Sequence, residues 1–134
     1  MKKDIHSVWK EYDWNEITHS ATHYLFAIKD LLETNGYARM TDISRKLEIT
    51  PGSCSIGIKS LLKKWLVIED ENKFIKLTKK SEVIIDHILH TRKILIKFFT
   101  KNLWSDDHEA NVNACKIEHL LSEELVQKLE KYLK

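Results

Sequence analysis

Apolar residues recur at helical spacing over most of the chain, and few residues interrupt the pattern. From Thr18, the apolar positions Tyr24, Leu25 and Ile28 lie on one helix face, and Asn35-Gly36 ends the run. The chain has 3 Gly and 1 Pro among its 134 residues, which predicts long helices and few tight turns. We therefore expect a mainly α-helical protein.

Two further short helices are predicted between residues 41 and 65. Thr41 is a suitable N-cap for the first of them. Thr50-Pro51 predicts the start of the next, because Thr caps well and Pro is favoured at the first helical position, and that helix should extend to about Trp65. Its core-facing residues are Ile58, Leu61 and Leu62. Towards the other side lie Ser53, Ser55, Ile56 and Lys59.

A β-hairpin follows these helices. Residues 66–68 and 74–77 are apolar runs separated by the turn sequence at 69–72. Three short helices and a hairpin are the order of a winged helix-turn-helix, in which the third helix enters the major groove of DNA.

The rest of the chain is predicted to be helical and dimeric. The stretch from Thr78 to about Trp104 is apolar nearly all round, so it must be buried on several sides, most simply against a second subunit. A helix over 106–121 and a last helix capped by Ser122 should follow, the latter with an apolar side of Leu125, Leu129, Tyr132 and Leu133.

The predicted fold is thus mainly α with a small β-wing, a winged helix-turn-helix followed by a helical dimerisation segment. We divide it into an N-terminal extension (1–17), a DNA-binding domain (18–78) and a helical dimerisation and sensing domain (79–134). The net charge is only +2, but residues 41–80 contain nine Lys or Arg and only five acidic residues. This local positive charge suits contact of the predicted DNA-binding domain with DNA. A solvated helix face would have the same composition.

The candidate DNA contacts lie in the third helix and the hairpin. Small hydroxylated residues at a helix start can bind phosphates, exposed side chains of the helix can meet base edges, and lysines can contact the backbone. These residues are Thr50, Gly52, Ser53, Ser55, Ile56, Lys59, Lys63 and Lys73. The alternative is a winged helix that docks a protein, since fold alone does not fix function.

A second candidate site is Cys115-Lys-Ile-Glu118-His119. Spacing of i, i+3 and i+4 places three metal-ligating side chains on one helix face, and His23 is a candidate fourth ligand. The alternative is a buried Cys beside an exposed Glu-His pair. No nucleophile elbow or phosphate loop accompanies the site, so we do not expect an enzyme. The 2 cysteines, far apart, and the lack of a signal peptide or membrane-spanning run favour the cytoplasm and no membrane partner.

The sequence resembles the diphtheria-toxin-repressor and manganese-repressor family of metal-dependent transcription regulators. The resemblance is carried from about residue 20 onward by Gly36-Tyr-Ala-Arg-Met-Thr-Asp-Ile43, by Leu47-Glu-Ile-Thr-Pro-Gly-Ser53 and by Ala114-Cys-Lys-Ile-Glu-His-Leu-Leu-Ser-Glu-Glu-Leu125. It implies a repressor that binds a palindromic operator in double-stranded DNA as a homodimer. It also implies one divalent metal per subunit, held by His23, Cys115, Glu118 and His119, a mixed set that suits Zn²⁺, Fe²⁺, Co²⁺ or Ni²⁺ better than Mn²⁺.

The chain departs from the family at other ligand positions. Arg92, Ile96, Asn111 and Phe26 stand where relatives have metal ligands, so the family's second metal site is dismantled. Arg92 can instead pair with Glu118 and replace an ion. The protein would then bind one metal or none. Without a metal, it would respond to thiol oxidation, to a small ligand or to no signal. The N-terminal extension, with His6, Trp9, Tyr12, Trp14 and His19, would pack on the partner subunit or cover the metal site.

Overall fold

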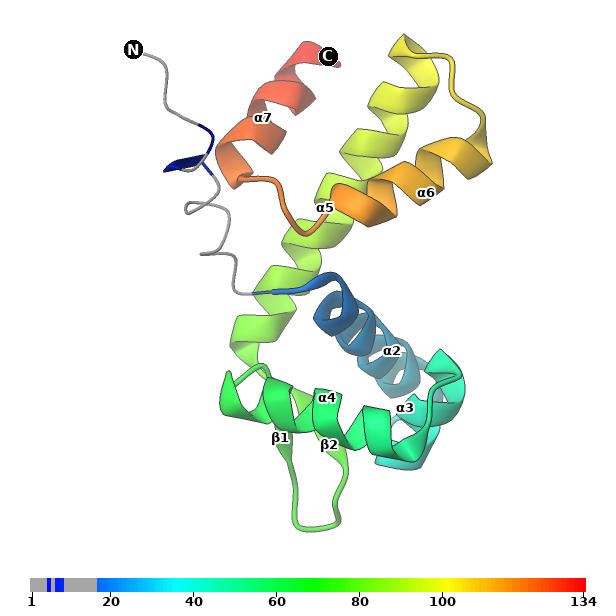
Figure 1. The fold of residues 1–134 in the computed structure, drawn as a ribbon, viewed down its shortest axis with the longest axis vertical. Helices are drawn as coiled ribbons and strands as arrows, with labels where there is room; N and C mark the ends of the chain where they lie inside the picture. The colour runs from blue at the N-terminus through cyan, green and yellow to red at the C-terminus, as the bar shows by residue number, and fades with distance from the viewer. Residues whose placement is uncertain (1–4, 6, 9–16) are drawn as a thin grey trace.

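The computed structural model describes residues 5, 7, 8 and 17–134. It confirms the predicted fold class, helices with one small hairpin (Figure 1). The predictions for His6, Trp9, Tyr12 and Trp14 concern residues outside those that the structure describes. From residue 17 onward the elements are α2 (His19–Asn35), α3 (Met40–Leu47), α4 (Pro51–Lys63), β1 (Val67–Glu69), β2 (Ile75–Leu77), α5 (Lys79–Asn102), α6 (Asp107–Ile117) and α7 (Glu123–Tyr132).

Local capping explains most helix starts. Thr50 accepts a hydrogen bond from the backbone N–H of Ser53, and Ser122 caps α7 in the same way, as expected from the sequence. The expectation that Thr41 caps α3 is wrong. The helix begins two residues earlier, at Met40 with Arg39 as its N-cap, because the carboxylate of Asp42 accepts a hydrogen bond from the Arg39 backbone N–H.

Helix α6 is shorter than predicted. It ends at Ile117, and Glu118 is its C-cap. A tight turn follows, in which the N–H of Leu120 bonds the carbonyl of Ile117 at 2.9 Å, before α7 begins. His119 therefore lies beyond the helix, and the helical i, i+4 spacing assumed for it does not apply.

The hairpin is a two-stranded antiparallel sheet in which Val67 pairs with Leu77. It is shorter than predicted, because Leu66 and Phe74 lie outside the paired strands. Asp70 closes the turn by accepting hydrogen bonds from the backbone N–H groups of Asn72 and Phe74, both at 2.9 Å. The hairpin projects below α4 as a wing (Figure 1).

One hydrophobic core joins α2, α3, α4, the wing and the start of α5. Its fully buried members include Leu25, Ile28, Ile43, Ile58, Leu61, Val67, Ile75 and Ile85. Helix α5 then leaves this core and continues to α6 and α7, which pack against its other half (Figure 1). The N-terminal helices with their hairpin and the C-terminal helices are therefore connected through one continuous helix.

The C-terminal helices leave apolar side chains exposed in the single chain. Val126 is the buried residue of α7, at 2% exposed, whereas Leu125 and Tyr132 of its predicted apolar side are 49% and 67% exposed. Trp104, after α5, is 87% exposed. Within the described residues, no helix is long and apolar enough to cross a membrane.

Candidate metal centre and nucleic-acid surface

A cluster of metal-ligating side chains joins α2 to α6. The Nε2 atom of His23 lies 3.3 Å from the Sγ atom of Cys115. His19, one turn earlier on α2, joins them, and one ligand atom from each of the three residues lies within 4.8 Å of the others. Imidazole and thiolate bind zinc-like ions with bonds of about 2.0–2.3 Å, so neighbouring ligand atoms in a tetrahedral site are about 3.4–3.6 Å apart. The donor set and its spacing fit such an ion.

Two histidines at the cluster favour their neutral form. Burial lowers the pKa of His23, and the nearby His19 and Arg92 lower it further. Burial also lowers the pKa of His119, with smaller contributions from His19 and His23. The rings of His19 and His119 are 5.5 Å apart between centroids. Neutral imidazole is the form that binds a metal, so this environment favours ligation over protonation.

Glu118 is paired with Arg92, as the sequence suggested it could be. Its Oε2 accepts a hydrogen bond from Nε of Arg92 at 2.5 Å, and its Oε1 accepts one from Nη2 at 2.7 Å. The residue is only 1% exposed. The hydrogen bond to Glu118 is the largest cause of a raised pKa of Arg92. The guanidinium also lies over the ring of Phe26, 5.2 Å from its centroid.

The ligand set predicted from sequence is therefore brought together in part. His23 and Cys115 are in contact, and the ring of His119 lies near that of His19. The carboxylate of Glu118 is hydrogen-bonded to Arg92 instead. From the sequence, His19 was expected to pack on the partner subunit or to cover the metal site, and not to be a ligand. Its i, i+4 spacing from His23 was the signal that it shares a helix face with that residue.

Helix α4 presents a polar face to solvent, with its apolar residues in the core. Cys54, Ile58 and Leu61 are buried, whereas Ile56 is 72% exposed. The other candidate DNA contacts are exposed, apart from the half-buried Ser55: Thr50, Gly52, Ser53, Lys59, Lys63 and Lys73. Lys73 lies at the tip of the wing with a positive φ of 65°. This face of α4 is therefore exposed on the side that the sequence predicts to enter the major groove of DNA.

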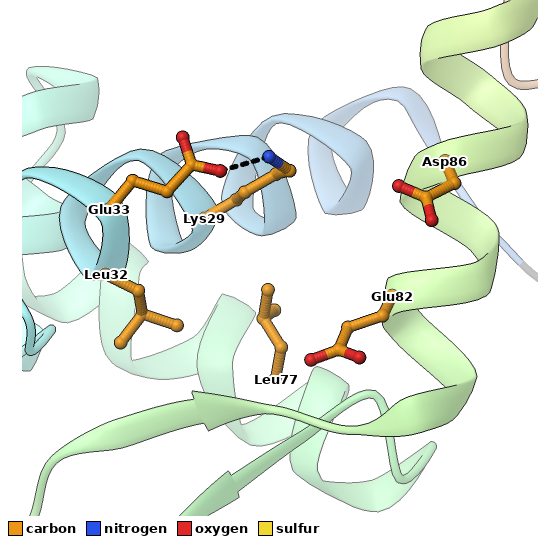
Figure 2. A pocket seen from close by; sticks show the side chains of 6 residues that line it. All are labelled: Lys29, Leu32, Glu33, Leu77, Glu82 and Asp86. Atoms are coloured by element: carbon orange, nitrogen blue, oxygen red, sulfur yellow. Dashed lines mark hydrogen bonds and ion pairs between the residues drawn. The ribbon is translucent and has the colours of Figure 1, made fainter.

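A groove of about 290 Å³ lies on another side of the molecule, between the end of α2, β2 and the start of α5 (Figure 2). Three carboxylates, from Glu33, Glu82 and Asp86, border it, and Lys29 is paired with Glu33. None of the residues proposed for metal or DNA lines this groove.

Comparison with known proteins identifies the family. Residues 78–134 match the model of the iron-dependent repressor metal-binding and dimerisation domain. The chain is 30% identical over 112 residues to the HTH-type transcriptional regulator MntR of Shouchella clausii (strain KSM-K16), covering 84% of this chain and 78% of that protein.

Solved structures have the same fold. A hypothetical protein from Sulfolobus solfataricus, SSo2273, matches with a TM-score of 0.75 at 23% identity, covering 87% of this chain and 89% of that one. The manganese regulator SloR matches with a TM-score of 0.74 at 26% identity over 87% of this chain, which spans 54% of SloR. The chain therefore belongs to the diphtheria-toxin-repressor and manganese-repressor family of metal-dependent transcription regulators.

Proposed function

We propose that this protein is a metal-responsive transcriptional repressor that binds a palindromic operator in double-stranded DNA as a homodimer. Each subunit binds one divalent transition metal, Zn²⁺, Fe²⁺, Co²⁺ or Ni²⁺ rather than Mn²⁺. The observation that carries the proposal is the contact between His23 on α2 and Cys115 on α6. The contact brings a cysteine sulfur and an imidazole nitrogen together where two parts of the chain, far apart in sequence, meet.

The position of the cluster explains how a metal would act on DNA binding. Helix α2 packs in the same core as α4, while α6 packs against α5. Ligands on α2 and α6 that share one ion restrict how the DNA-binding domain sits relative to the C-terminal helices. Since α4 packs on α2 in one core, metal binding would select one arrangement of α4 relative to the C-terminal helices. Of the sequence-derived ligands, His23 and Cys115 belong to the cluster, and His119 lies beside it with its ring 5.5 Å from that of His19.

The DNA contacts belong to α4 and the wing. The exposed Ile56 would meet a base edge, where an apolar side chain can contact a thymine methyl group. Thr50 and Ser53, at the start of α4, would bind phosphate together with the helix N-terminus. Lys59, Lys63 and Lys73 would add salt-dependent phosphate contacts.

The test is DNA affinity with and without metal. An operator is first selected from a random duplex library with the full-length, reduced protein, in separate selections with Zn²⁺ and with chelator. Fluorescence anisotropy then measures the dissociation constant in both conditions.

Metal should tighten binding by about 5–150-fold, the usual range of allosteric coupling. His23→Ala should abolish that difference, whereas His108→Ala, at an exposed histidine outside the cluster, should keep it. Equal affinities with Zn²⁺ and with chelator would contradict the proposal.

A further inference from the structure

We infer that His19 is a metal ligand and that Glu118 is not. The ion is bound by His19, His23 and Cys115, while Glu118 serves as the buried counter-ion of Arg92. His119, whose ring is 5.5 Å from that of His19, is the candidate for the fourth position. The inference rests on the proposed function, which supplies a metal at this place, and it identifies a ligand on α2 that the Cys-x-x-Glu-His pattern does not contain.

The geometry of α2 brings His19 to the site. It is the first residue of the helix, after the Thr18 cap, and it lies one turn before His23. Residues four apart share a helix face, and the two rings are 4.6 Å apart between centroids. His19 is exposed whereas His23 and Cys115 are half-buried, so its ring lies on the solvent side of the cluster. Ligand atoms now within 4.8 Å would have to approach by only about 1 Å to reach tetrahedral spacing.

The carboxylate of Glu118 is already used. Both of its oxygens accept hydrogen bonds from Arg92, in a two-point guanidinium pair. Turning it towards the cluster would leave the guanidinium without that partner beside a divalent cation. Removing one member of a buried ion pair costs more than most single interactions provide. The pair therefore keeps Glu118 out of the ligand set.

The change of ligand decides which ions the site prefers. With Glu118, the site would contain a hard carboxylate oxygen. With His19, it contains one thiolate and imidazoles only, a set that suits Zn²⁺, Co²⁺ or Ni²⁺ and offers nothing that Mn²⁺ prefers. The ligands would carry one negative charge, that of the thiolate, while the charges of Arg92 and Glu118 balance each other.

The test titrates Co²⁺ into reduced, metal-free, full-length protein and records the visible absorption bands and the thiolate charge-transfer band. His19→Ala should weaken Co²⁺ binding by at least about 10-fold and change the visible bands, since even residues behind the ligands matter by that factor. His108→Ala is the matched control and should bind as the wild type does. In the double variant Arg92→Gln with Glu118→Gln, the two amides can still hydrogen-bond and every proposed ligand remains, so it should still bind Co²⁺ with the wild-type visible bands. Its affinity is not expected to equal that of the wild type, because the Arg92 guanidinium also interacts with His23 and Cys115. Circular dichroism verifies folding of each variant.

The outcomes separate this inference from the proposed function. Loss of binding in His19→Ala alone supports it. Wild-type binding in His19→Ala overturns the inference without contradicting a metal at this place. Loss of Co²⁺ binding in the folded double variant overturns the exclusion of Glu118 from the ligand set. If the wild-type protein binds no Co²⁺, the proposed function fails and the inference fails with it. If the double variant does not fold, His19→Ala against His108→Ala still decides.

Discussion

The Nε2 atom of His23 and the Sγ atom of Cys115 lie 3.3 Å apart, although 92 residues separate them in the sequence. The first belongs to α2 and the second to α6, so the contact depends on how the C-terminal helices pack on the DNA-binding domain. In the proposed site, the sulfur is the donor that most strongly separates soft from hard ions.

Replacing that sulfur should change the metal preference. Cys115→Asp exchanges a thiolate for a carboxylate of the same charge, which Mn²⁺ accepts far better relative to Zn²⁺. We expect the ratio of Zn²⁺ to Mn²⁺ affinity to fall by at least about 10-fold, a difference of about 1.4 kcal/mol. Competition titrations with a metal-sensitive dye measure both affinities. An unchanged ratio would show that Cys115 is not a ligand.

Arg92→Ala should destabilise the fold because it leaves the carboxylate of Glu118, 1% exposed, without its partner. Breaking a buried pair costs about 3–5 kcal/mol, whereas replacing both members by apolar residues costs much less. Urea unfolding should therefore show a large loss for Arg92→Ala and partial recovery in Arg92→Met with Glu118→Leu. Lys93→Ala, at the exposed neighbouring position, is the control. Equal losses in the single and double variants would argue against this pair as the cause.

Gly57→Ala should destabilise the packing of α4 on α2. A Cβ at this position would lie 2.6 Å from the Oη atom of Tyr24, whose ring is only 9% exposed and whose hydroxyl donates to the carbonyl of Ser53. Alanine gains about 1 kcal/mol of helix propensity over glycine. Overpacking typically costs about 1–3 kcal/mol, so the clash should offset or exceed that gain.

Thermal unfolding provides the comparison for this substitution. Gly52→Ala is the matched control, because no atom lies within 4 Å of a Cβ there, and it should be neutral or stabilising. In a Tyr24→Leu background the ring is absent, and Gly57→Ala should then no longer destabilise. A stabilised Gly57→Ala single variant would mean that Tyr24 moves aside at little cost.

Asp42 should make stability depend on acid pH. Its hydrogen bond from the Arg39 side chain holds the pKa of the carboxyl below its ordinary value. Because the folded pKa is lower than the unfolded value of about 3.9, the contribution is fully present above that pH and is lost as pH falls through the folded pKa. Asp42→Asn should lower the free energy of unfolding by about 1 kcal/mol at neutral pH, the usual worth of a helix cap. The difference in the free energy of unfolding between wild type and variant should shrink below pH ~4. A difference that stays constant with pH would contradict this role of Asp42.

The lysines of the proposed DNA surface should appear in the salt dependence of binding. Each phosphate contact contributes about 0.9 to the slope of log affinity against log salt. Lys59→Ala, Lys63→Ala and Lys73→Ala should each reduce that slope by about 1, while leaving sequence preference unchanged. Ile56→Ala should instead reduce discrimination at one base pair. Lys101→Ala, exposed at the far end of α5, should change neither.

Sequence alone predicted the features that depend on neighbouring residues. Thr50-Pro51 marks a helix start because the cap and the proline act within one turn, and Ser122 does the same for α7. The same local reasoning chose Thr41 for α3, where the side chain of Asp42 instead fixes the start after Arg39. The sequence does not show that the carboxylate of Asp42 bonds back to the Arg39 backbone N–H, because that contact depends on the path of the chain before the helix.

The candidate site could be predicted only in its residue types. The i, i+3 spacing places Cys115 and Glu118 on one side of a helix. It does not determine which of the two side chains contacts α2 and which contacts α5. That choice depends on the rotation of α6 and on Arg92, which pairs with Glu118 from a third helix. His19 was overlooked as a ligand because it precedes the family's first ligand position, although it lies one turn from His23.

Helix α5 has a mechanical consequence for how two subunits would read one operator. It is anchored at its start, where the hydroxyl of Thr78 donates to the carbonyl of Trp65 at 2.8 Å. Its 24 residues form a rod roughly 36 Å long at about 1.5 Å per residue. A tilt of about 5° at that anchor displaces the far end by about 3 Å, and successive half-sites on DNA are about 34 Å apart. In the proposed dimer, the angle of this rod would therefore set whether both α4 helices can enter successive major grooves at once.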